Sequence, residues 1–130
     1  MEKAAISFII VERDPFIGRD LSQGLAEVCS DAETVQVGAL SDVASKVFYA
    51  IHAGRHPVIV TKASLAEIDR HRISDLVAQT GADMVVRLDD HPADVLAQRG
   101  WISLPSPFTF EDLQVLGSVF CEQAFHRRSA

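Results

Sequence analysis

The sequence lacks the residue patterns that build metal centres, disulfide frameworks and membrane spans. It holds two cysteines, Cys29 and Cys121, which are far apart and match no metal-ligand spacing. We therefore expect both to be reduced, buried thiols of a cytoplasmic protein. No apolar run approaches the roughly 18 residues that a membrane span requires. The first residues do not predict a signal peptide either, because the apolar stretch behind them is short and strand-like. We expect no membrane association.

Excess positive charge and glycine-rich motifs are also missing. Lysine and arginine number 12 against 18 aspartates and glutamates, so the net charge is −6. A nucleic-acid-binding domain usually carries a basic face, and this balance argues against one. No Gly-x-Gly-x-x-Gly or Walker sequence is present, and none of the five histidines has metal-ligand spacing. The sequence thus predicts no nucleic-acid partner, no cofactor and no metal.

Alternating strand and helix patterns fill the chain. With 48% hydrophobic and 23% charged residues, its composition is that of one globular domain over residues 1–130. Short apolar, β-branched runs predict strands at Ile6–Val11, Thr34–Val37, Pro57–Thr61, Ala82–Leu88 and Trp101–Leu104. Helical spacing predicts helices at Pro15–Cys29, from an N-cap at Ser41 to Gly54, at Leu65–Gln79, at Pro92–Gln98 and at Phe110–Phe125. This order implies a doubly wound α/β fold, a five-stranded parallel sheet covered on both faces.

Two motifs resemble those of a known family. Residues 6–17 read Ile-Ser-Phe-Ile-Ile-Val-Glu-Arg-Asp-Pro-Phe-Ile, and residues 105–113 read Pro-Ser-Pro-Phe-Thr-Phe-Glu-Asp-Leu. The first resembles the Val-(Asp/Glu)-Asp-(Asp/Glu)-Pro-Leu-Ile opening of bacterial response-regulator receiver domains, and the second resembles their Val-Lys-Pro-Phe ending. The resemblance extends to about residue 124. It implies a flavodoxin-like (βα)5 fold and a cis peptide bond between Ser106 and Pro107.

Most of the functional residues of receiver domains are replaced at the matching positions of this sequence. Glu12 matches the first acid of the family's acidic pair, but Arg13 stands at the second, which the family needs for Mg²⁺. Lys62 stands where the resemblance places the phosphoacceptor aspartate. The family's Ser/Thr on the fourth strand, switch aromatic and lysine correspond to Asp89, Ser103 and Ser106. The resemblance is therefore to a degenerate, pseudo-receiver form.

These replacements exclude phosphorylation at the usual site. A lysine cannot form an acyl phosphate, and a fixed guanidinium opposes the oxygen-bound Mg²⁺ that phosphoryl transfer needs. The predicted degenerate pocket comprises Glu12, Arg13, Asp14, Lys62, Asp89 and Ser106. We expect Lys62 to lie inside it between Glu12 and Asp89, because a buried ammonium needs a carboxylate partner. The alternative is that Lys62 extends into solvent.

The last predicted helix carries more apolar residues than one buried stripe requires. In receiver-like domains this region forms the usual partner surface, so we expect a homodimer or a docking site there. The candidate interface residues are Val115, Val119 and Phe120. The alternative is that the short helix after Pro92 covers part of this face.

Together these observations predict a non-enzymatic signalling domain. It would act through protein–protein interaction in two-component or phosphorelay regulation, without being phosphorylated. The alternative function is a small-molecule or anion sensor that uses the pocket around Arg13 and Lys62. A small enzyme of the same architecture is a further rival, although no catalytic set supports it.

Overall fold

The sheet has five parallel strands in the order β2-β1-β3-β4-β5. It is seen in a computed structural model that describes residues 5–88 and 93–122. The strands are β1 (Ala5–Val11), β2 (Glu33–Val37), β3 (Arg55–Thr61), β4 (Asp83–Leu88) and β5 (Ile102–Pro105). All five lie within two residues of their predicted bounds. The predicted flavodoxin-like fold is confirmed.

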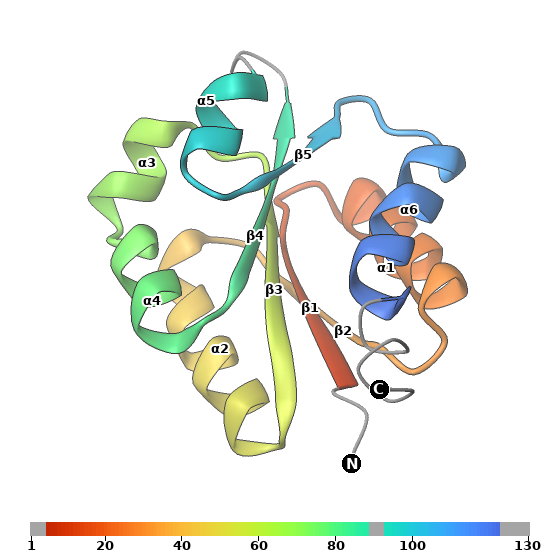
Figure 1. The fold of residues 1–130 in the computed structure, drawn as a ribbon, viewed down its shortest axis with the longest axis horizontal. Helices are drawn as coiled ribbons and strands as arrows, with labels where there is room; N and C mark the ends of the chain where they lie inside the picture. The colour runs from red at the N-terminus through yellow and green to blue at the C-terminus, as the bar shows by residue number, and fades with distance from the viewer. Residues whose placement is uncertain (1–4, 89–92, 123–130) are drawn as a thin grey trace.

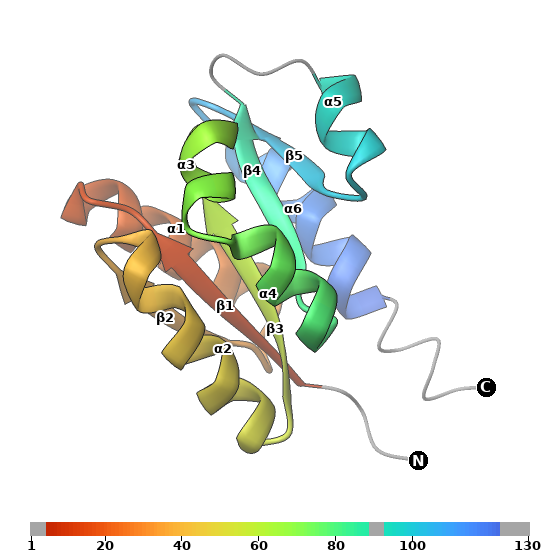
Figure 2. The same ribbon diagram turned by 90° about the vertical axis from the view of Figure 1, so that its left-hand side faces the viewer.

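Helices cover both faces of the sheet (Figures 1 and 2). One layer consists of α1 (Pro15–Val28) and α6 (Phe110–Gly117), which continues as a π-helical turn over Ser118–Glu122. The other layer consists of a 3-10 turn (Leu40–Asp42), α2 (Val43–His52), α3 (Leu65–Arg70), α4 (Ile73–Thr80) and α5 (Ala93–Gln98). None of the helices in the described part of the chain is both long and apolar enough to cross a membrane.

Strand residues alternate between two cores. Phe8 and Ile10 of β1 pack with the α1–α6 layer, whereas Ile9 between them packs with the α2–α5 layer. The same alternation places Val85 of β4 in the first core and Val86 in the second. Because a parallel sheet is buried on both faces, nearly every residue of its central strands is apolar. An ionisable residue in such a strand is therefore conspicuous.

Two helix predictions need correction. The single helix predicted over Leu65–Gln79 is two helices, because Arg72 adopts a left-handed conformation with φ of 57° and interrupts the hydrogen-bond ladder. No glycine marks this break in the sequence. Ser41 does not cap α2, which instead follows the 3-10 turn. The predicted end of the last helix at Phe125 lies outside the described residues.

The predicted inner faces of α1 and α2 are also partly wrong. The helical spacing of apolar residues in the sequence places Phe16 on the inner side of α1 and Phe48 and Ile51 on that of α2, but they are 77%, 54% and 41% exposed. In α2 the sheet is contacted by Val47 and the small Ala50, and Phe48 points about 100° away from Val47 around the helix. This layer therefore leaves large apolar side chains on the surface.

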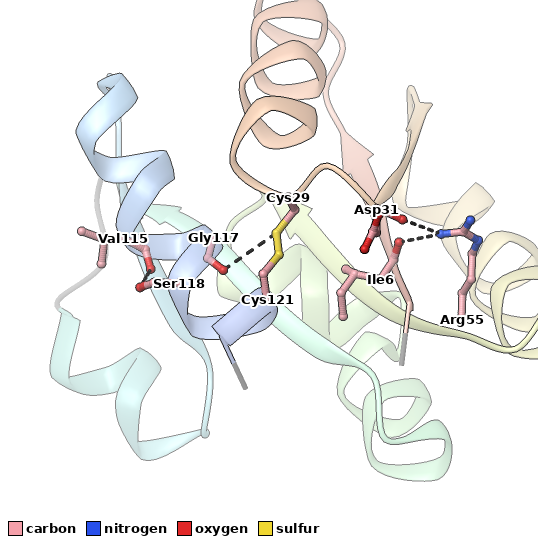
Figure 3. The surroundings of a disulfide bond; sticks show 8 residues. All are labelled: Ile6, Cys29, Asp31, Arg55, Val115, Gly117, Ser118 and Cys121. Atoms are coloured by element: carbon pink, nitrogen blue, oxygen red, sulfur yellow. Dashed lines mark hydrogen bonds between the residues drawn. A yellow bond between two sulfur atoms is a disulfide. The ribbon is translucent and has the colours of Figure 1, made fainter. Parts of the chain in front are cut away.

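The expectation of two reduced thiols is wrong. Cys29, which follows the last turn of α1, forms a disulfide with Cys121 in the π-helical turn, and their Cα atoms are 6.1 Å apart (Figure 3). The sequence separation of 92 residues gave no hint of this pairing. Cytoplasmic location was inferred partly from reduced cysteines, so it stays a prediction with less support.

Candidate functional site

The carboxyl edge of the sheet gathers the residues that follow each strand. The parallel register aligns Val11 of β1 with Thr61 of β3, Thr61 with Val86 of β4, and Val86 with Ser103 of β5. Glu12, Lys62 and Arg87 therefore occupy equivalent positions one residue further along their strands. In flavodoxin-like folds this edge is where ligands and chemistry are found.

Arg87 is the charged residue buried at this edge. Its side chain is only 3% exposed, and its guanidinium pairs with the carboxylate of Glu12, which is 13% exposed. The second terminal nitrogen of the guanidinium lies 3.4 Å from the Ser106 hydroxyl oxygen, and its carbon lies 5.7 Å from the centroid of the Phe108 ring. Among the residues that the structure describes, Nε has no hydrogen-bond partner. A fixed cation thus fills the space between β1, β4 and the loop after β5.

Sequence reasoning missed Arg87 and assigned its position to Asp89. The register shows that the β4 residue level with Lys62 is Arg87, two residues earlier. Asp89 itself lies outside the described residues. A signal was available, because an arginine within the run Val85-Val86-Arg87-Leu88 must be paired if the strand is buried.

Lys62 does not take the predicted place inside the pocket. Its side chain is exposed, and the carboxylate of Glu12 is bound by Arg87. The other predicted partner, Asp89, lies outside the described residues, so its pairing with Lys62 stays a prediction. Arg13 is exposed as well, so neither replacement cation is buried.

The remaining predicted pocket residues stabilise the loops. Oδ1 of Asp14 accepts a hydrogen bond from the Phe16 amide at 2.9 Å, which caps α1. Oε2 of Glu12 accepts from the Asp14 amide at 3.0 Å, so both oxygens of Glu12 are engaged. Ser106 precedes a cis peptide bond to Pro107, as predicted. Ser106 and Phe108, on either side of Pro107, both contact Arg87.

A cleft of about 300 Å³ opens beside this pair. Residues that follow β1, β2 and β3 line it together with Glu67 and His71 of the α3 region, and its cationic side chains include Arg13 and Lys62. Among the described residues no group of histidine, cysteine or acidic side chains gathers that could hold a metal.

Glu67 on the wall of this cleft is already held by its own helix. Its Oε1 lies 3.2 Å from both the amide nitrogen and the hydroxyl oxygen of Ser64, which completes a capping box at the start of α3. The Ser64 amide, then its hydroxyl, lowers the pKa of Glu67 below its usual value, with smaller contributions from Arg70 and Arg13. Glu67 therefore stays ionised at neutral pH.

The candidate interface residues divide between core and surface. Phe120 is 4% exposed and packs edge-to-face on Phe8, with ring centroids 5.9 Å apart. Val119 is half-buried against the same core. Val115 is 67% exposed, and Phe110 in the first turn of α6 is 48% exposed. Of the three predicted residues, Val115 is thus the one that a partner can reach fully.

Comparisons with known proteins support the fold. No family model and no curated protein matches the sequence. A pilus assembly-related protein from Burkholderia pseudomallei aligns with a TM-score of 0.65 and 13% identity, over 95% of this chain and 92% of its own. A 3-dehydroquinate dehydratase-like protein from Bifidobacterium longum aligns with 0.57 and 9% identity, over 92% and 97%. The response regulator StyR aligns with 0.56 and 17% identity, over 97% of this chain and 66% of its own. At these identities the likeness shows that the chain has a receiver-like, flavodoxin-like fold.

Proposed function

We propose that this chain is a pseudo-receiver, a signalling domain of two-component or phosphorelay regulation that acts by binding protein partners and is not phosphorylated. The observation that carries the proposal is the buried pair of Arg87 and Glu12. In the receiver family that this chain resembles, the first acid helps to hold Mg²⁺. Here the same carboxylate holds a guanidinium of the protein itself.

The charges at this edge oppose phosphoryl transfer in three ways. Lys62 offers an amine where the family has its carboxylate nucleophile. Arg13 and Arg87 place positive charge where an oxygen-bound Mg²⁺ would sit. Ser106 replaces the lysine that the family uses beside the phosphoryl group. The internal pair would hold the edge in one conformation, so output would depend on partner binding and not on a chemical switch.

Phosphoryl donors test this proposal directly. We expect incubation with acetyl phosphate and Mg²⁺ to leave the intact mass unchanged, and beryllofluoride to leave the melting temperature unchanged. A phosphorylatable receiver domain treated in parallel provides the positive control. A gain of one phosphoryl group on any aspartate of this chain would sink the pseudo-receiver proposal.

The proposed partner surface is the exposed side of α6, used for self-association. Val115 is its most exposed apolar residue. We expect sedimentation to show a dimer that Val115→Glu converts to a folded monomer. Gln114→Glu, which adds the same charge at an exposed neighbouring position, should leave the dimer intact. A wild-type monomer would remove this surface from consideration.

A further inference from the structure

The cleft next to the Arg87–Glu12 pair lies where this fold binds ligands. In the order β2-β1-β3-β4-β5 the chain changes direction between β1 and β3, and ligands of such sheets bind outside the carboxyl ends of strands at that point. Arg13 follows β1, Lys62 follows β3, and Gly38 follows β2, and all three line the cleft. The cleft is therefore built from three separate loops at the strand ends.

Among the described residues, the two carboxylates that line the cleft are already engaged within the protein. Glu12 is paired with the buried guanidinium of Arg87. Glu67 is bound by the amide and hydroxyl of Ser64. The positive charge of Arg13 helps to lower the pKa of Glu67. Among the described residues, however, the Arg13 side chain makes no hydrogen bond or ion pair. An anion in the cleft would thus reach the Arg13 guanidinium without displacing a hydrogen bond or ion pair of Arg13 to another described residue.

We propose that this cleft binds a small phosphate-bearing anion. A guanidinium fork suits phosphate because it can donate two parallel hydrogen bonds, and an ammonium from the opposite loop adds a second charge. The volume of about 300 Å³ is at the lower end of the range of small-molecule sites, roughly 300–1,000 Å³. That size fits a phosphorylated or diphosphorylated metabolite better than a dinucleotide. The apolar side chains of Val11 and Leu40 on the lining would contact its carbon skeleton.

This site differs from a receiver's phosphorylation site in its chemistry. Binding is reversible, needs no divalent metal and forms no covalent bond. It also does not depend on which protein the domain contacts. The phosphoryl-donor experiment measures covalent transfer, whereas the experiment below measures equilibrium binding, so either proposal can fail alone.

A titration with inorganic pyrophosphate tests the site. We would follow amide chemical shifts of ¹⁵N-labelled protein at constant ionic strength and without divalent metal. The expected result is saturable binding with shifts confined to the loops after β1, β2 and β3 and to α3. Arg13→Gln and Lys62→Gln should each weaken binding by about tenfold or more, the usual effect of losing a hydrogen bond to a charged group. Both side chains are exposed, so both variants should fold.

Lys46→Gln is the matched control. Lys46 is an exposed cation on α2 outside the cleft, and removing it changes the net charge by the same amount. We expect this variant to bind pyrophosphate as the wild type does. The proposal is overturned if shifts never saturate, if they spread evenly over surface cations, or if Lys46→Gln weakens binding as much as Arg13→Gln.

Discussion

The two helix layers of this domain are built differently. In the α1–α6 layer the helices approach closely, since a Cβ added at Gly117 would lie 2.8 Å from Val28, and a disulfide joins their ends. The α2–α5 layer consists of four separate helices (Figure 2), with a break at Arg72 between α3 and α4. No disulfide crosses that layer in the part of the chain that the structure describes.

The difference in construction indicates different roles for the two layers. The cross-linked layer packs behind Arg87, because Val85 and Arg87 point to the same face of β4. The second layer contributes the cleft residues Glu67 and His71. We infer that the first layer holds the internal ion pair in place and that the second presents groups to ligands. The predictions below test this division.

The largest expected effect comes from removing the disulfide. The bond closes a loop across 92 residues, and replacing both Cys29 and Cys121 by alanine should lower the free energy of unfolding by about 4 kcal/mol. Urea unfolding of oxidised, reduced and double-variant protein measures it. Equal midpoints for oxidised and reduced protein would mean that the cross-link does not stabilise this layer.

Close helix packing gives the next effect. Gly117→Ala places a methyl group against the side chain and the carbonyl of Val28, so we expect a loss of about 2 kcal/mol. Gly38→Ala is the control, because a Cβ there meets nothing within 4 Å, and its stability should barely change. If both variants unfold at the same urea concentration, the two layers are equally tolerant and the comparison fails.

The capping box of α3 gives the smallest effect. Ser64→Ala removes the cap and should cost about 1 kcal/mol at neutral pH. The pKa of Glu67 is lowered in the folded protein by Ser64, so the stability from this contact is present above the ordinary glutamate pKa and is lost as the pH falls through the folded pKa. In acid the difference between the wild type and the variant should therefore shrink, because the bond from the Ser64 hydroxyl to the Glu67 carboxylate weakens. It should not vanish, because the bond from the Glu67 amide to the Ser64 hydroxyl does not depend on pH. A difference that stays constant down to pH 3 would contradict this account.

The sequence predicted the fold well because the strand signals are local. β-branched runs and the acid-to-proline transition after β1 set the element order, and the proline motif after β5 identified the cis bond before Pro107. The capping box of Thr109 and Asp112 at the start of α6 is equally local, since it follows the Thr-x-x-Asp pattern of the sequence. Each of these features depends on fewer than ten consecutive residues.

The site was predicted less well because its contacts are long-range. The partner of Glu12 depends on the register of β3 against β4, which a sequence pattern does not fix. The disulfide depends on where α1 and the π-helical turn end in space. The helix break at Arg72 lacks the glycine that usually marks a positive φ. Loop residues such as Arg13 and Lys62 were assigned to the correct edge but not to their exposed positions.

The central claim is that Arg87 occupies the space that Mg²⁺ and the phosphoryl group take in a receiver domain. Its buried positive charge is compensated by the carboxylate of Glu12. Equilibrium urea unfolding of Glu12→Gln, measured in the wild type and in an Arg87→Met background, tests it most directly. With Arg87 present, the change strands a buried cation and should cost about 3 kcal/mol. In the Arg87→Met background it should cost close to nothing, and Lys62→Met should be near neutral as an exposed control. The same loss from Glu12→Gln in both backgrounds would contradict the claim.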